Sequence, residues 1–200
     1  MNILDVGLSF SNLSKRANTN RIMLHHSGVT VLQSVEVVHN YHIKTNGYSG
    51  IGYHFYVRKD GAIYKGRPED CVGAHALGDR ANFDSIGICF EGNFSVEDMS
   101  EAQKQSGKEL VSYLKQKYGI NRVQGHREVN STSCPGTYFP FAEIAEVPAG
   151  ITLAPDADMN HNGVEDIKEV IKNLQRAINN TFGTKILVDG VYRKTDPRGY

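Results

Sequence analysis

Two short segments that lie far apart in the sequence each end an apolar stretch with side chains that can bind a metal ion. They are residues 24–28, with the sequence LHHSG, and residues 125–136, with the sequence GHREVNSTSCPG. Together they offer one imidazole of the first segment, the imidazole of His126 and the thiolate of Cys134 to a single cation. Two His ligands and one Cys ligand suit zinc with an open fourth position. Because water bound at that position loses a proton near neutral pH, the pattern indicates a hydrolase.

The neighbouring residues His25 and His26 cannot both bind that ion if their segment is a strand, because successive side chains of a strand point to opposite faces. The residues alone leave open which of the two is the ligand. They also leave open plainer roles, since a histidine at a strand end is more often a hydrogen-bonding residue, and His126 could be a buried histidine bonded to a carbonyl. The spacing to Cys134, through the sharp turn at 134–136, favours metal binding.

The composition limits the size of the fold and its partners. The 200 residues, of which 40% are hydrophobic, predict one main domain with a small second module. Because 22 basic residues balance 22 acidic ones, we expect neither nucleic acid nor a membrane as a partner. The N-terminus lacks a basic, apolar leader, which predicts a protein made in the cytoplasm without a signal peptide. Three cysteines in such a compartment predict no disulfide, with Cys89 as a small core residue.

The alternation of apolar strands with helical patterns predicts an α/β fold. Strands are expected at residues 21–25, 53–57, 62–65, 85–90 and 121–124, and helices at residues 32–44 and 100–118. A turn at 59–61 joins two of the strands into a hairpin, and a Ser-x-x-Gln sequence caps the start of the second helix. We therefore expect a sheet covered by helices.

The sequence changes character after residue 146. Residues 147–157 predict a linker, and residues 158–200 predict a small, mainly helical C-terminal segment whose apolar stripe needs a cover. Residues 158–169 fit an EF-hand loop, which makes calcium a second candidate cofactor. Its ligands would be Asp158, Asn160, Asn162, Val164, Asp166 and Glu169. Against this, Glu165 stands where an apolar residue is usual, and a linker rich in Asp and Asn gives the same match by chance.

Several short blocks of the chain follow one another in a distinctive order. They are LHHS at 24–27, GYHF at 52–55, VGAHA at 72–76, SIGI at 85–88, GNF at 92–94, GH at 125–126 and SCPG at 133–136. With these blocks, residues 15–146 resemble the type 2 N-acetylmuramoyl-L-alanine amidases, which include phage endolysins and peptidoglycan recognition proteins. The resemblance implies a central mixed β-sheet flanked by helices in a catalytic domain at residues 1–146. It also implies a zinc enzyme that cuts the amide between the lactyl group of N-acetylmuramic acid and L-alanine in bacterial peptidoglycan.

The resemblance further implies a role for each matching residue. The first histidine of the pair, His25, would join His126 and Cys134 as a zinc ligand. Tyr53 matches the family's catalytic tyrosine, whose hydroxyl bonds the water or the oxyanion. Thr132 stands where other members carry Lys or Thr, and a threonine can donate to an oxyanion without supplying positive charge.

Four more positions concern the substrate and the general base. His75 and Asn93 match blocks that line the family's substrate groove. More distant amidases of this fold carry a Glu base on the strand at 85–91, and Cys89 occupies that position here. Glu91 shares a face with Cys89 by alternation. Glu91 is therefore either a substitute base or a solvated carboxylate at a strand end, since base work requires reach to the water.

The end of the chain, at 171–179 and 188–195, is similar to the first part of peptidoglycan-binding modules. Because the chain stops early, this segment would be truncated, divergent, or completed on the catalytic domain or by a second chain, which leaves wall binding and a homo-oligomer open. We predict a zinc amidase of the phage endolysin kind, which lyses the host and acts on the cell wall after release. The alternatives are a non-catalytic recognition protein and a host autolysin. Cys134 favours an enzyme over a recognition protein, because recognition-only members typically lose this ligand.

Overall fold

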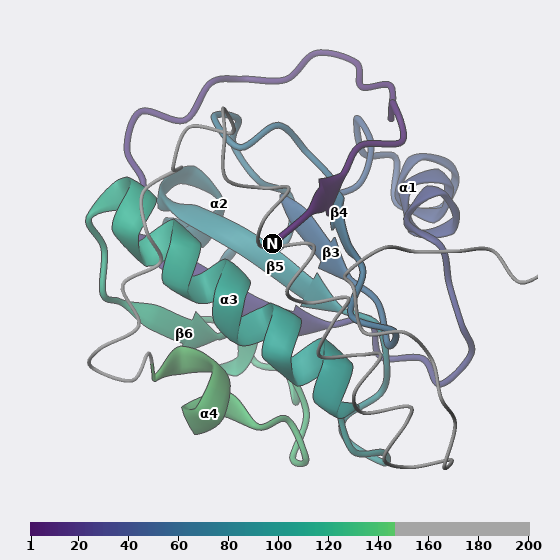
Figure 1. Ribbon diagram of the computed structural model, residues 1–200. Coiled ribbons are helices and arrows are strands. Elements are labelled where there is room, and N and C mark those ends of the chain that lie inside the picture. Colours follow the sequence, from purple (N-terminus) through teal and green to yellow (C-terminus); the bar gives the residue numbers. More distant parts are fainter. Residues whose placement is uncertain (147–200) are drawn as a thin grey trace, which may run out of the picture. The chain divides into compact units, whose positions relative to one another are not determined.

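The computed structural model describes residues 1–146, which form a six-stranded β-sheet flanked by helices. The strands lie in the order β1-β4-β3-β5-β2-β6 (Figure 1). Their bounds are β1 Ile3–Leu4, β2 Arg21–His26, β3 Phe55–Val57, β4 Ile63–Lys65, β5 Ser85–Phe90 and β6 Val123–Gly125. Only β3 and β4 pair antiparallel, so the sheet is mixed. This confirms the predicted fold class.

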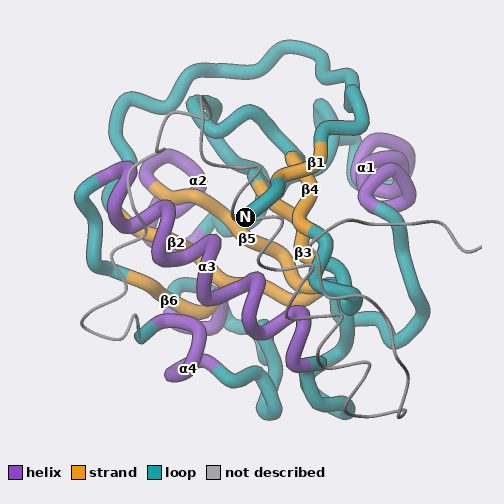
Figure 2. Tube along the Cα trace, viewed as in Figure 1, coloured by secondary structure: helices purple, strands orange, loops and turns teal. Residues whose placement is uncertain are grey.

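The helices lie between and after these strands (Figure 2). They are α1 Val35–Lys44, α2 Ala81–Asp84, α3 Glu101–Tyr118 and α4 Phe141–Ala145, with short 3-10 turns at Gly78–Arg80 and His126–Glu128. The start of α3 is as predicted, because the side chain of Ser100 accepts a hydrogen bond from the backbone of Gln103 at 3.2 Å. The helix ends at Gly119, whose φ of 63° suits glycine.

The helix α1 begins three residues later than its apolar pattern predicts. The side chain of Ser34 accepts a hydrogen bond from the backbone of Val37 and so forms the N-cap. Leu32 fits the helical period, but it lies before this cap and is 68% exposed. The prediction of a helix from residue 32 is therefore wrong at its start.

The alternation of side chains along the central strands builds one apolar cluster on each face of the sheet. On one face, Ile22 and Leu24 of β2 join the even-numbered apolar residues of β5 beneath α3, which crosses the sheet in Figure 1. On the other face, Cys89 joins Val35 and Val38 of α1. The odd-numbered residues of β2, which include His25, therefore belong to the α1 face.

Some predictions concern residues 147–200 or properties of the chain other than the sheet. The expected linker at 147–157, the C-terminal segment at 158–200 and the calcium loop at 158–169 lie outside the described residues. All three cysteines of the chain are free thiols. Among the described helices, none combines the length and the apolar character needed to cross a membrane.

Candidate metal centre

The three side chains of the predicted metal site meet at one edge of the sheet. Because β2 and β6 are parallel and pair Leu24 with Gly125, the residues that follow, His25 and His126, leave the sheet side by side. Cys134 comes from the loop after His126. The ligand atoms of the three residues all lie within 4.8 Å of one another. Nδ1 of His25 is 3.8 Å from Sγ of Cys134, and the two imidazole rings have centroids 4.6 Å apart.

The loop that carries Cys134 is tied to the sheet by its backbone. The carbonyl of Cys134 accepts a hydrogen bond from the backbone of Arg127 at 2.9 Å. Its thiol accepts one from the backbone of His26 at 3.4 Å. Gly136 has a φ of 106°, and a Cβ there would lie 2.3 Å from the backbone of Phe94. The Cys-Pro-Gly turn thus needs glycine to bring the thiol against β2.

The chemistry of these donors suits zinc. Burial lowers the pKa of His25 and of His126, so both imidazoles are neutral and offer lone pairs. Burial raises the pKa of the Cys134 thiol to about 11, so that a cation is needed to favour the thiolate. In tetrahedral zinc sites, ligand atoms lie about 3.5 Å apart, which is close to the separation of His25 and Cys134. Two imidazoles with a thiolate favour zinc over calcium or magnesium.

The structure places His26 on the opposite face from the cluster. Its Nδ1 accepts a hydrogen bond from the backbone of Phe94 at 3.2 Å, and its ring tilts toward the ring of that residue. In the part of the chain that the structure describes, the residues that group as a metal site are His25, His126 and Cys134. Of the two neighbouring histidines, His25 is thus the one that the structure places with His126 and Cys134.

Tyr53 and Thr132 border the cluster on different sides. The ring of Tyr53 lies 5.1 Å from that of His25, and burial raises the pKa of the tyrosine well above its usual value. Its hydroxyl therefore keeps its proton and can donate a hydrogen bond. Thr132 is exposed, and its hydroxyl accepts a hydrogen bond from the backbone of Cys134 at 3.2 Å.

Cys89 and Glu91 are both fully buried, which bears on the search for a general base. Cys89 packs on the α1 face next to Tyr53, and burial raises the pKa of its thiol. The carboxylate of Glu91 accepts hydrogen bonds from the backbone of Gln33 at 2.5 Å and of Lys59 at 3.0 Å. The expectation of a solvated carboxylate is therefore wrong. Glu91 joins two loops, and both its oxygens are engaged in that contact.

The two predicted groove residues lie in different surroundings. Nδ1 of His75 is 3.0 Å from Nε2 of His25, on the side of that ring away from Cys134. Asn93 is half-buried, and its side-chain oxygen accepts a hydrogen bond from the backbone of Ser95 at 3.2 Å. Substrate contact by either residue stays a prediction.

A hollow of about 240 Å³ opens beside Tyr53 and was missed by sequence reasoning. It is lined by Ser27, Val29, Gln33, Val38, Tyr41, His42 and Tyr53, and we call it the α1 hollow. A signal for it existed, because Val38, Tyr41 and His42 recur at the i, i+3 and i+4 spacing of one helix face. Nδ1 of His42 accepts a hydrogen bond from the backbone of Gly52 at 2.9 Å, which fixes its ring in the wall.

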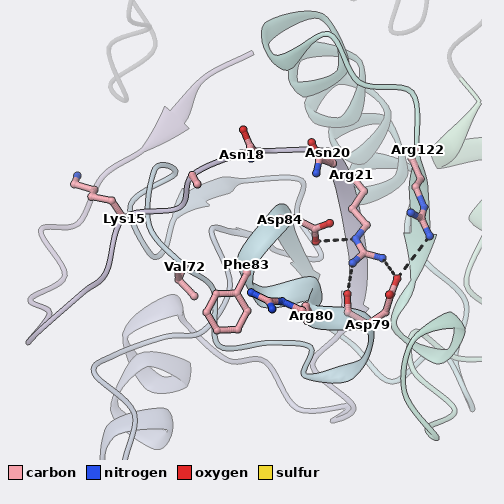
Figure 3. A pocket seen from close by; sticks show the side chains of 11 residues that line it. Lys15, Asn18, Asn20, Arg21, Val72, Asp79, Arg80, Phe83, Asp84 and Arg122 are labelled. Atoms are coloured by element: carbon pink, nitrogen blue, oxygen red, sulfur yellow. Dashed lines mark hydrogen bonds and ion pairs between the residues drawn. The ribbon is translucent and has the colours of Figure 1, made fainter.

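A second hollow, of about 480 Å³, lies at the opposite end of β2 (Figure 3). Arg21 points into a ring of acceptors there, with Asp79 at 2.6 Å and Asp84 at 2.9 Å. Asp79 also pairs with Arg122 at 3.8 Å. We call it the Arg21 hollow. Its central charge is paired within the protein.

Comparison with known proteins assigns the chain to a family. A family model described as N-acetylmuramoyl-L-alanine amidase matches residues 15–137. The chain therefore belongs to the N-acetylmuramoyl-L-alanine amidase family.

Three similar proteins, one solved structure and two known sequences, illustrate the relationship. The solved structure of an endolysin N-acetylmuramoyl-L-alanine amidase from Clostridium intestinale URNW is 43% identical, with a TM-score of 0.68 over 72% of this chain and 92% of that chain. The endolysin of Klebsiella phage KP32 is 33% identical over 129 residues, which are 61% of this chain and 83% of the phage protein. Peptidoglycan-recognition protein SC2 of Drosophila melanogaster is 38% identical over 112 residues, 54% of this chain and 58% of that protein. The chain thus spans little more than half the length of this recognition protein.

Proposed function

We propose that this chain is a zinc-dependent N-acetylmuramoyl-L-alanine amidase that hydrolyses the lactyl-L-alanine amide of bacterial peptidoglycan. The convergence of His25, His126 and Cys134, with ligand atoms within 4.8 Å of one another, carries the proposal. When bound, zinc supplies Lewis acidity toward a carbonyl oxygen and lowers the pKa of water at its open position. The family membership and the endolysin relatives support the same reaction.

In this proposal the chain's own residues bind and orient the scissile amide. The Tyr53 hydroxyl, which keeps its proton, donates a hydrogen bond to the carbonyl oxygen as negative charge develops on it. The exposed hydroxyl of Thr132 donates from the rim of the cluster. The α1 hollow, which Tyr53 also lines, receives the part of the substrate next to the amide. These groups position the amide, and they bring no positive charge.

The endolysin relatives suggest a biological setting. We propose that the protein is made in the cytoplasm of an infected bacterium and lyses the host from within after release to the wall. A host autolysin would carry the same site and the same reaction. The partner in either case is peptidoglycan, and the neutral net charge argues against nucleic acid.

A second candidate function is recognition of peptidoglycan without cleavage. The similarity to the Drosophila recognition protein favours it. The thiol of Cys134, held against β2 by the backbone of His26, argues for catalysis, because binding alone needs no third metal ligand. The two functions differ in whether products form.

Mass spectrometry of digested cell walls tests the proposal. The full chain, loaded with zinc, is incubated with purified bacterial walls, and the soluble products are identified. Free stem peptides with N-terminal alanine are expected. New reducing sugar ends would indicate a glycosidase, and binding without products would indicate recognition. Cys134→Ser should abolish product release, whereas Cys71→Ser, the same change at a buried thiol outside the cluster, should preserve it.

A further inference from the structure

His75 contacts the metal ligand His25 from the side away from the cluster. Nδ1 of His25 faces Sγ of Cys134 at 3.8 Å, whereas its Nε2 lies 3.0 Å from Nδ1 of His75. One nitrogen of the His25 ring is therefore directed to the metal site and the other to a second histidine. The ring planes of the two histidines meet at 77°, an edge-on arrangement that fits a nitrogen-to-nitrogen hydrogen bond.

This contact fixes where the protons lie if His25 binds a metal. A ligating nitrogen carries no proton, so Nδ1 of His25 is bare and Nε2 holds the hydrogen. That N–H must donate to Nδ1 of His75, which must then be the acceptor. His75 consequently carries its own proton on Nε2. Each ring is restricted to one tautomer by the other.

The position of His75 is set by the surrounding backbone. The side-chain oxygen of Asn82 accepts hydrogen bonds from the backbone of His75 at 2.7 Å and of Ala76 at 2.8 Å. The ring lies against Gly73 and Gly87, where an added Cβ would be 2.5 Å from its Cδ2 atom. Two residues without side chains therefore make room for this ring, and the scaffold holds it before any metal binds.

The ring of His75 has no other hydrogen bond within residues 1–146. Its Nε2 is buried and meets no partner there. A residue that recognises the substrate would present a polar atom to the substrate groove. The two ring nitrogens of His75 instead face His25 or the protein interior. The contact with His25 is thus the one polar interaction that the ring makes in the described structure.

We propose that His75 is a positioning residue, which accepts the Nε2–H of His25 and so fixes the tautomer and orientation of that metal ligand. The inference rests on the proposed zinc function, and it gives His75 a role distinct from substrate contact. Partners of this kind typically change metal affinity by 10–100-fold when they are removed.

Zinc titration of full-length variants tests this role without measuring catalysis. His75→Leu fills similar space but lacks an acceptor, and it should weaken zinc binding by about 10–100-fold in competition with a chromophoric chelator. His75→Asn carries an oxygen near the position of Nδ1 and should restore most of the affinity. Asn93→Ala, at the other predicted groove position, should bind zinc as the wild type does. Unchanged affinity in His75→Leu, or equal losses in the Leu and Asn variants, would overturn the proposal.

Nitrogen NMR of the wild type provides a second test that needs no substitution. In the zinc-loaded protein, the proton of His25 and that of His75 should both reside on Nε2. A proton on Nδ1 of His75 would overturn the inference, even if a variant failed to fold. If the wild-type chain binds no zinc at all, the proposed function itself fails, and this outcome differs from normal zinc binding with an indifferent His75.

Discussion

The two ends of β2 both bury polar side chains, but they satisfy them differently. At the N-terminal end, Arg21 is 1% exposed, and its guanidinium is paired with Asp79, Asp84 and the side chain of Gln124. At the C-terminal end, His25 is also 1% exposed, but one of its nitrogens converges with other lone-pair donors. A buried charge with partners on all sides is satisfied within the protein and offers nothing to a ligand. Converging neutral donors form a site for a cation.

The largest expected effect contrasts two adjacent residues of the ligand end. His25→Ala should weaken zinc binding by more than about 100-fold, since even a partner behind the ligand is worth 10–100-fold. His26→Ala should keep zinc affinity and lose about 1 kcal/mol of stability, because it removes the hydrogen bond to the backbone of Phe94. Competition titration and urea unfolding measure the two effects. Equal zinc losses would contradict the assignment of faces.

At the other end of the strand, the expected loss is in stability alone. Arg21→Met should lower the free energy of unfolding by about 2 kcal/mol, because it removes the hydrogen bonds of the buried guanidinium to Asp84 and to the side chain of Gln124. Zinc affinity should not change. Lys15→Met in the same hollow breaks an exposed ion pair with Asp70 and should leave the free energy of unfolding close to that of the wild type. A weaker zinc affinity in Arg21→Met would contradict the separation of the two ends of β2 into a structural end and a metal-binding end.

Glu91 sharpens the comparison between the two ends of β2. It lies just beyond β5, near the end of β2 that carries His25, yet both of its carboxylate oxygens accept hydrogen bonds. Glu91→Gln leaves one of two backbone N–H groups without an acceptor and should cost about 2 kcal/mol of stability. Hydrolysis by the folded variant should stay close to the wild-type rate. A fall of about 100-fold or more, without loss of stability, would instead make Glu91 the general base. Glu97→Gln, at a partly exposed carboxylate, is the matched control.

The smallest effect concerns how two buried histidines, His42 and His54, and the carboxylate of Asp79 beside Arg21 respond to acid. Burial lowers the pKa of His42 to about 4 and that of His54 to about 3, from a usual 6.5. As the pH falls, these histidines bind protons in the unfolded chain before they do so in the folded one. Their contribution to the free energy of unfolding is therefore complete above pH 6.5 and declines as the pH falls toward 4 and 3. A hydrogen bond from Arg21 lowers the pKa of Asp79 below 3.8, so its contribution is lost only below that pH.

Urea unfolding of the metal-free protein from about pH 8 to about pH 3 checks this order. Stability should begin to fall in the histidine range before the carboxylates titrate. His42→Gln should make the first part of the curve less steep, since the other buried histidines still titrate there, and should leave the acidic part unchanged. A wild-type curve that is level down to the carboxylate range would contradict the assignment of His42 as a buried neutral histidine.

Local rules explain which parts of the site could be predicted from the sequence. Strand alternation required that only one of His25 and His26 be a ligand, and the Cys-Pro-Gly turn marked Cys134. The main strands, the helix after Ser100 and the α/β fold followed from apolar patterning in the same way, whereas the mixed sheet was implied by the family resemblance. Each of these features depends on a few consecutive residues.

The features that could not be predicted depend on which segments become neighbours. The contact of His75 with His25 requires Gly73 and Gly87 to leave room for a ring, and no local pattern states this. The burial of Glu91 requires the loop at 28–34 to return over the end of β5. The exposed Leu32 is a different case, because the local N-cap at Ser34, and not the helical period, places it outside α1. Side-chain environments are therefore the part of the site that needed a structure.

The position of β6 in the sheet has a kinetic consequence. Within residues 1–146, this three-residue strand is the outer neighbour of β2 and has no strand on its other side. It leads directly into His126, so local opening of this edge would carry away one metal ligand while the buried strands β2 and β5 stay paired. Exchange of a bound ion would then be set by fraying of an edge, at a lower free-energy cost than global unfolding.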